Sequence, residues 1–193
     1  MKPLNIAIFV SGGGTNCENI IEYFKGSETV HIALVISNRP DAFALVRAQR
    51  HQVPTAIVSK ADLADPDIVM PLMQRYGIEF IVLAGFLPLI PNYLIDAYPR
   101  RIVNLHPALL PKFGGKGMYG HHVHEAVKAA GETETGMTVH YVSPVCDGGD
   151  IIAQFSTPLS PEDTVDDIAE KEHVLEMKYF PKVLEELLSI LNS

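Results

Sequence analysis

Three polar residues, Asn104, His106 and Asp147, carry groups that could together stabilise an oxyanion and move a proton. Asn104 and His106 end an apolar segment that begins at Ile102, and strand alternation places their side chains on one face. Asp147 precedes two glycines; a carboxylate beside His106 would raise the pKa of the imidazole, while burial would raise that of the carboxyl. The same residues also fit structural roles, namely a buried histidine, an asparagine at a turn and an ordinary Asp-Gly turn.

A glycine-rich segment with the sequence SGGGTN, residues 11–16, lies between an apolar run and a helical pattern. Glycines there let backbone N–H groups approach an anion, and a helix N-terminus adds partial positive charge. The dinucleotide fingerprint fails because Cys17 stands at its third glycine, and the Walker pattern lacks its Gly-Lys-Ser/Thr end. What is left is a small nest for one phosphate at Gly14, Thr15 and Asn16. The alternative is a tight turn that binds nothing.

Three histidines, His121, His122 and His124, follow a glycine-rich loop at 112–120. On a helix their side chains diverge, and neither an i,i+4 pair of ligands nor a thiolate accompanies them. We therefore expect a helix start that lines a pocket, and no metal site.

Four other side chains leave structural and functional interpretations open. His140 lies on a predicted strand and faces either the core or the site. Glu172 and Glu176 are spaced i,i+4 on a predicted helix, where one can turn inward, although exposed glutamates are the usual case. Cys146 adjoins Asp147, but no base is evident beside it, so a free thiol is the better interpretation.

Alternating strand and helix patterns supply the framework for these residues. The predicted strands are 4–10, 30–36, 55–58, 80–84, 102–105, 138–142 and 151–157, and the predicted helices are 15–24, 42–49, 65–76, 91–97, 121–130 and 164–191. This order predicts a single α/β domain, 1–193, with a mostly parallel sheet covered by helices on both faces. The last two strands could pair antiparallel. Ligands of such sheets bind at the carboxyl ends of the strands.

The composition limits the class of protein. The 193 residues are 47% hydrophobic and 20% charged, which suits one globular domain rather than a disordered chain. A formal charge of -8 opposes general nucleic-acid binding, which needs excess Lys and Arg. No apolar run reaches the roughly 18 residues of a membrane-spanning helix, and two cysteines provide no disulfide framework. We therefore expect a soluble, cytoplasmic protein with no membrane or nucleic-acid partner, in which local geometry holds any anionic ligand.

Five segments in one order resemble the folate-dependent formyltransferases: SGGGTN, VLAGFLPLI, NLHPALLPKF, GMTVHYV and CDGGDII. The resemblance runs over residues 5–181, and the phosphate loop narrows it to the branch that acts on glycinamide ribonucleotide. It implies a doubly wound, Rossmann-like formyltransferase fold. It also implies transfer of the formyl group of 10-formyltetrahydrofolate to the ribonucleotide's amine in purine synthesis, by direct attack through an oxyanion intermediate, with neither a metal nor a covalent enzyme intermediate.

The resemblance assigns roles to individual residues. Asn104, His106 and Asp147 match the catalytic trio: Asn104 and a protonated His106 would stabilise the oxyanion, while Asp147 would keep His106 protonated and help remove the amine proton. Glu176 fits the glutamate that faces the glycinamide amine, and His140 fits a site-facing histidine. The residues matched to the ribonucleotide phosphate are Gly14, Thr15 and Asn16, and those matched to the folate are Leu83, Leu87, Pro88, Leu89, Ile90, Asn104, Val142, Val145 and Cys146.

Three other functions compete with this one. Methionyl-tRNA formyltransferase would carry a second, basic domain and formyltetrahydrofolate hydrolase an extra N-terminal domain, for which we expect no room in 193 residues. A non-catalytic nucleotide sensor would keep the phosphate loop without needing Asn104, His106 and Asp147 together. We expect two small-molecule substrates and a monomer or homodimer.

Overall fold

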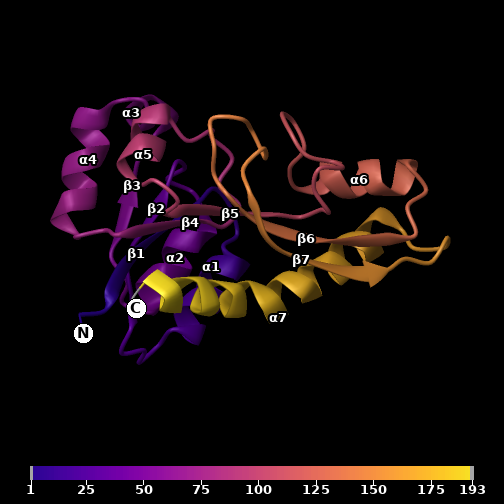
Figure 1. The fold of residues 1–193 in the computed structure, drawn as a ribbon, viewed down its shortest axis with the longest axis horizontal. Coiled ribbons are helices and arrows are strands. Elements are labelled where there is room, and N and C mark those ends of the chain that lie inside the picture. The colour runs from indigo at the N-terminus through magenta and orange to yellow at the C-terminus, as the bar shows by residue number, and fades with distance from the viewer. Residues whose placement is uncertain (1, 192–193) are drawn as a thin grey trace.

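A single mixed sheet organises residues 2–191, the part of the chain that the computed structural model describes (Figure 1). Its seven strands lie in the order β3-β2-β1-β4-β5-β6-β7. The strands are β1 Leu4–Val10, β2 Val30–Ser37, β3 Thr55–Ile57, β4 Phe80–Leu83, β5 Ile102–His106, β6 Glu134–Tyr141 and β7 Ile151–Pro158. The helices are α1 Thr15–Tyr23, α2 Phe43–Arg50, α3 Lys60–Leu63, α4 Pro66–Arg75, α5 Asn92–Ala97, α6 His121–Ala129 and α7 Val165–Leu191. The predicted α/β class is confirmed.

Strand direction changes at the β6 side of the sheet. Strands β3, β2, β1, β4 and β5 pair parallel, whereas β6 pairs antiparallel with both β5 and β7. The antiparallel pairing expected of the last two strands is therefore confirmed. The predicted start of β6 at 138 is wrong, because the strand begins at Glu134. Gly136 looks like a strand breaker in the sequence, but a Cβ there would overlap the Phe155 carbonyl of β7, so close pairing of the strands requires glycine.

Helices cover both faces of the sheet, with α1, α2 and α7 on one face and α3, α4 and α5 on the other (Figure 1). Each face has its own cluster of buried apolar side chains. Ile8 and Val82 belong to the cluster that includes Leu184 of α7, and their neighbours Phe9 and Ile81 belong to the other. Adjacent residues of a strand thus serve opposite cores, which explains why the strands are continuous apolar runs.

Capping residues set the helix starts. The Asp65 side chain accepts a hydrogen bond from the Asp67 N–H at 2.9 Å, and Pro66 is the first residue of α4, as predicted. The short helix α3 was not expected from the sequence; it begins with a capping box between Ser59 and Asp62. Four residues are too few to show apolar periodicity.

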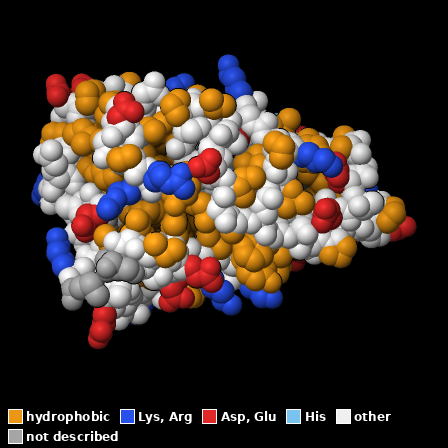
Figure 2. All heavy atoms as spheres, viewed as in Figure 1, with side chains coloured by type: hydrophobic (Ala, Val, Ile, Leu, Met, Phe, Trp, Pro, Cys, Tyr) orange, Lys and Arg blue, Asp and Glu red, His pale blue; other side chains and the backbone are white. Residues whose placement is uncertain are grey.

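The surface mixes charged and apolar side chains. Lys and Arg side chains form separate small groups among hydrophobic and acidic ones on the face seen in Figure 2. Across the described residues, none of the helices combines the length and the apolar character needed to cross a membrane.

The carboxyl ends of β1, β4 and β5 lie next to one another. Leu83 at the end of β4 pairs with Phe9 on one side and with Asn104 on the other. The glycine-rich turn after β1 and the segment after β4 are joined, because the Ser11 hydroxyl accepts a hydrogen bond from a backbone N–H of that segment at 2.9 Å. The sheet thus brings the sequence-predicted residues to the edge where α/β folds bind ligands.

Candidate active site

Asn104, His106 and Asp147 lie together, Asp147 reaching β5 from the loop between β6 and β7. His106 Nδ1 is 3.7 Å from Oδ2 of Asp147. The second carboxylate oxygen, Oδ1, is 3.6 Å from Nε2 of His140. That nitrogen is in turn 3.1 Å from Nδ2 of Asn104. The four side chains therefore form one connected polar group.

His140, whose orientation the sequence left open, faces the site and is 2% exposed. Its Nδ1–H donates to the Tyr141 carbonyl at 2.9 Å, which leaves Nε2 to accept from the Asn104 amide. One N–H of Asn104 is thereby engaged and the amide plane is oriented. The other N–H can then point at a ligand.

His106 is 3% exposed, and its Nε2–H donates to the Phe113 carbonyl at 2.8 Å. Burial lowers the pKa of His106 below its ordinary 6.5, although the Asp147 carboxylate opposes this. Burial thus favours the neutral form of the imidazole and opposes the protonated His106 that the resemblance implies, which stays a prediction.

Asp147 has a left-handed backbone, with φ 52°, which aspartate tolerates better than most residues. Its Oδ2 accepts a hydrogen bond from the Gly115 N–H at 2.9 Å. Burial by itself would raise the pKa of Asp147, but the nearby His140 imidazole, the hydrogen bond from the Gly115 N–H and the His106 imidazole lower it below its ordinary 3.8. Asp147 is therefore a carboxylate at neutral pH and can accept a proton.

The 11–16 segment forms the turn from β1 into α1. Gly14 is the N-cap residue of α1 and adopts φ 77° and ψ 28°, in the left-handed region that glycine favours. Because glycine has no side chain to cap the helix, the first N–H groups of α1 are left for another partner. Gly12, Gly13 and Thr15 are exposed. The turn thus has the geometry and the donors of a small anion nest.

Asn16 connects this turn to α7. Its Nδ2–H donates to Oε2 of Glu176 at 2.8 Å, and Nδ1 of His173 is 2.9 Å from the same oxygen. The Asn16 carbonyl oxygen Oδ1 is buried and has no hydrogen-bond partner among the described residues. Since buried acceptors are normally paired, this oxygen is suited to a polar group of a ligand.

Both glutamates of the i,i+4 pair are buried: Glu172 is 2% exposed and Glu176 8%. The usual expectation of exposed glutamates is wrong here, because α1 and α6 pack against α7. Burial raises the pKa of Glu172 well above 4.5, and the adjacent Glu176 adds to this. Within residues 2–191, Glu172 Oε1 and Nδ1 of the buried His124 also lack hydrogen-bond partners.

The three histidines of α6 diverge as expected. His124 is buried, whereas His121 and His122 are exposed and lie 3.9 and 3.3 Å from carboxylate oxygens of Glu125. The described part of the chain contains no group of three or more His, Cys, Asp or Glu side chains arranged to hold a metal ion.

The residues matched to the folate fall into three classes by their exposure to solvent. Leu83 and Ile90 belong to the core, with 5% and 9% exposed. Leu87, Leu89 and Val145 present 52%, 69% and 68% of their surface to solvent. The N–H of Leu87 is already bonded to the Ser11 hydroxyl and is not available to a ligand. Partly buried residues of the set are Pro88, Asn104, Val142 and Cys146.

Three contributors to the site were missed in the sequence. The carbonyl of Phe113 and the N–H of Gly115 orient His106 and Asp147, and a backbone group carries no residue-type signal. The third is Arg47 of α2, whose Nε–H donates to the Gly13 carbonyl at 2.9 Å. No sequence pattern relates an arginine on α2 to a turn 34 residues earlier.

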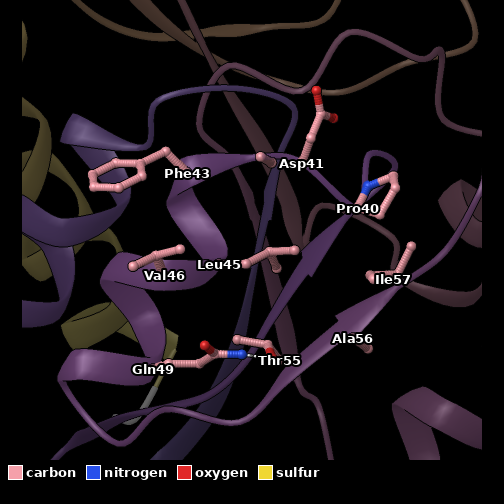
Figure 3. A pocket seen from close by; sticks show the side chains of 10 residues that line it. Pro40, Asp41, Phe43, Leu45, Val46, Gln49, Thr55, Ala56 and Ile57 are labelled. Carbon is pink, nitrogen blue, oxygen red and sulfur yellow. Dashed lines mark hydrogen bonds between the residues drawn. The ribbon is translucent and has the colours of Figure 1, made fainter.

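A cavity of about 390 Å³ lies between α2 and β3 (Figure 3). The residues that line it are Pro40, Asp41, Ala42, Phe43, Leu45, Val46, Gln49, Thr55, Ala56 and Ile57. None of the sequence-predicted site residues is among them. This cavity is therefore separate from the polar group around Asp147.

Comparison with known proteins points to one family. The sequence model of the family described as "Formyl transferase" matches residues 4–184. Phosphoribosylglycinamide formyltransferase of Haemophilus influenzae is 34% identical over 184 residues, which cover 93% of this chain and 84% of that protein. The chloroplastic enzyme of that name from Arabidopsis thaliana is 38% identical over 191 residues, or 94% of this chain. This chain spans 65% of the Arabidopsis protein and 62% of its Vigna unguiculata counterpart, less than two thirds of each.

Comparison with solved structures points to the same family. The crystal structure of phosphoribosylglycinamide formyltransferase from Bacillus halodurans superposes with a TM-score of 0.86 at 35% identity. The superposition covers 96% of this chain and 95% of that one.

Proposed function

The chain belongs to the formyl transferase family, and we propose that it transfers the formyl group of 10-formyltetrahydrofolate to the primary amine of glycinamide ribonucleotide in purine synthesis. The observation that carries the proposal is the meeting of Asn104, His106 and Asp147 at the sheet edge that also holds the glycine-rich turn. An anion nest and an acid–base group at one edge suit a substrate with a phosphate at one end and a nucleophile at the other. Relatives with this activity in their names support the choice of substrate.

The ribonucleotide would lie along α1. Its phosphate would bind the N–H groups at Gly14, Thr15 and Asn16, where the helix dipole favours an anion. Its amine would face Glu176, which the Asn16 amide holds. Because Asn16 touches both ends of this arrangement, it would set the distance between the phosphate and the nucleophile.

The oxyanion would be stabilised from β5. As the amine attacks the formyl carbon, negative charge develops on the formyl oxygen, and the free N–H of Asn104 would donate to it. Burial lowers the pKa of His106, and a growing anion beside the imidazole raises it. The imidazole can then take up a proton at Nδ1, which faces Asp147.

The proton that the amine loses passes through Asp147 and His106 to the folate nitrogen. The attacking amine forms a bond to the formyl carbon and loses a proton to Asp147, directly or through water. Asp147 passes this proton to His106 Nδ1. When the bond from carbon to the folate nitrogen breaks, that nitrogen takes the proton, leaving formylated ribonucleotide and tetrahydrofolate. These reaction steps involve neither a metal ion nor a covalent enzyme intermediate.

The folate would bind between two loops. The exposed apolar side chains of Leu87, Leu89 and Val145 suit the flat faces of a pterin ring, and backbone carbonyls of residues 87–90 suit its polar edge. Leu83, Ile90 and Val142 would support these loops from the core.

One assay tests the acceptor. The protein is incubated with 10-formyltetrahydrofolate and, separately, glycinamide ribonucleotide, charged initiator tRNA or water alone. Release of tetrahydrofolate only with the ribonucleotide supports the proposal. Release without an acceptor indicates a hydrolase, release only with the tRNA indicates a tRNA formyltransferase, and no release under any condition favours a nucleotide sensor.

The proposed function is accompanied by inferences about the domain, the location, the oligomeric state and the partners of the protein. We infer a single formyl transferase domain over 1–193, of which Met1, Asn192 and Ser193 lie outside the described residues. We also infer a cytoplasmic location, a monomer or homodimer, and no nucleic-acid or membrane partner. The -8 charge is consistent with the last of these inferences.

A further inference from the structure

Two residues of α2, Ala44 and Arg47, hold the glycine-rich turn through hydrogen bonds to carbonyl groups of that turn. The Ala44 N–H donates to the Gly12 carbonyl at 3.1 Å, and Arg47 Nε–H donates to the Gly13 carbonyl at 2.9 Å. Ala44 also packs against Gly14 so closely that a Cβ on Gly14 would overlap it. Two successive peptide groups are thus held from the same side.

These two hydrogen bonds determine where the N–H groups of the turn point. In a planar trans peptide the C=O and N–H are directed oppositely. With the carbonyls of Gly12 and Gly13 directed at α2, the N–H groups of the same two peptides, those of Gly13 and Gly14, are directed away from α2. α2 therefore orients two N–H groups of the turn: the backbone N–H of Ala44 fixes that of Gly13, and Arg47 fixes that of Gly14, which is a donor of the anion nest.

Arg47 also neutralises an unfavourable charge. Glu18 lies in the first turn of α1, where its carboxylate would repel a bound phosphate. The Arg47 guanidinium forms an ion pair with Glu18, and Nε2 of His51 lies 3.3 Å from the other Glu18 oxygen. Both side chains of the ion pair are about three-quarters buried, with 24% and 21% exposed, so solvent screens the pair only partly.

We propose that Arg47 is a positioning residue of the phosphate site: it aims the Gly14 N–H group at a phosphate monoester and cancels the charge of Glu18. The inference deepens the proposed function and rests on it for the identity of the phosphate. Arg47 acts through the turn and needs no contact with the ligand.

The chain offers a matched control on the same helix. The guanidinium groups of Arg47 and Arg50 both lie over the Phe43 ring, at 5.0 and 5.4 Å from its centroid. Phe43 stands at the start of α2 and is directed away from Thr55 and Ile57 (Figure 3). Among the hydrogen bonds and ion pairs of residues 2–191, Arg50 has none to the glycine-rich turn. Arg50→Ala therefore removes an equal charge and a similar ring contact without touching the turn.

The experiment measures affinity for ribose 5-phosphate by titration calorimetry, and the KM and kcat for glycinamide ribonucleotide. Arg47→Ala should weaken ribose 5-phosphate binding about tenfold or more. The KM for the ribonucleotide should rise similarly, with kcat and the KM for the folate little changed. Arg47→Lys keeps a charge near Glu18 but cannot make both bonds of the planar fork, so its affinity should be intermediate. Arg50→Ala should bind as the wild type does.

A double variant separates the two roles. In Arg47→Ala with Glu18→Gln the repelling carboxylate is gone, so affinity should recover in part. Complete recovery would overturn the aiming role, and no recovery would overturn the neutralising role. Thermal unfolding checks that each variant is folded; if Arg47→Ala is not, Arg47→Lys measured against Arg50→Ala decides the question.

The outcomes also separate this inference from the proposed function. Equal affinities of Arg47→Ala and Arg50→Ala, or no binding of ribose 5-phosphate by the wild type, would overturn the inference even if formyl transfer occurs. Loss of binding in Arg47→Ala alone, in a protein that transfers no formyl group, would support the inference and reject the proposed function.

Discussion

The Asn16 side chain donates a hydrogen bond to Glu176 across 160 residues of sequence, with 2.8 Å between Nδ2 and Oε2. One residue belongs to the first turn of α1 and the other to the middle of α7. In the proposed complex these residues meet opposite ends of one substrate. Their contact therefore makes the spacing between the phosphate nest and the amine a property of how α1 packs against α7.

Removal of this contact should affect the ribonucleotide and spare the folate. Asn16→Ala loses a hydrogen bond to a charged group, which is worth about 1.5–3 kcal/mol. The KM for the ribonucleotide should rise about tenfold or more, and the KM for the folate should stay near that of the wild type. Asn19→Ala is the control, because Asn19 also links α1 to α7, through the Met177 carbonyl at 2.9 Å, but on the exposed side. Equal kinetics for the two variants would contradict the role of Asn16.

Loss of either acid–base group should remove most of the activity and leave the fold intact. His106→Ala and Asp147→Ala should each lower kcat by about 10²–10³, with circular dichroism like that of the wild type. Asp150→Asn removes a nearby carboxylate that is exposed and paired with Arg100 at 2.7 Å, so its kcat should not change. Turnover near the wild-type value in His106→Ala or Asp147→Ala would reject the assignment of the trio.

A side chain at Gly14 should disrupt the phosphate turn. Gly14→Ala places a Cβ at φ 77° and into Ala44, which should cost about 1–3 kcal/mol of unfolding free energy and abolish ribose 5-phosphate binding. Gly12→Ala tests the same chemical change where no atom lies within 4 Å of the added Cβ and φ is unstrained. Denaturant unfolding of both variants measures the difference; if Gly12→Ala lost as much stability as Gly14→Ala, the steric explanation would fail.

Glu172 should make the protein less stable as the pH rises. Its pKa is raised by burial, so above about pH 4.5 the unfolded chain releases a proton that the folded protein retains or loses only at a cost. Stability from the protonated form is complete below pH 4.5 and declines as the pH rises toward the folded-state pKa. Glutamine is neutral throughout, so Glu172→Gln should gain melting temperature relative to the wild type from pH 5 to pH 8.

The control for this prediction is Glu170→Gln, which changes an exposed glutamate on the same helix. Its difference in melting temperature from the wild type should be small and nearly independent of pH. A Glu172→Gln protein that melts below the wild type at pH 8 would show that the buried carboxyl is stabilised by a partner instead.

Local patterns were enough to predict most of the fold. β1 is apolar throughout because both of its faces are buried, and α4 starts at Asp65 because that side chain caps it. The exceptions had local causes as well. α3 is too short to show apolar periodicity. The first half of β6 was missed because it contains Gly136, and the sequence does not reveal that the Phe155 carbonyl lies against this glycine.

The site was likewise predictable from the sequence only in part. Strand–turn–helix geometry is local, so the sequence predicted an anion nest at Gly14, and strand alternation placed Asn104 and His106 on one face. The types of Asn104, His106 and Asp147 also fitted structural roles, and the oxyanion group was predicted from the resemblance to the formyltransferases. Tertiary packing alone decided the burial of His106, which lowers its pKa, the burial of Glu172 and the contact of Arg47 with Gly13. Desolvation and hydrogen-bond partners depend on which distant segments cover a side chain, and α6, α7 and α2 reach these residues from remote parts of the chain.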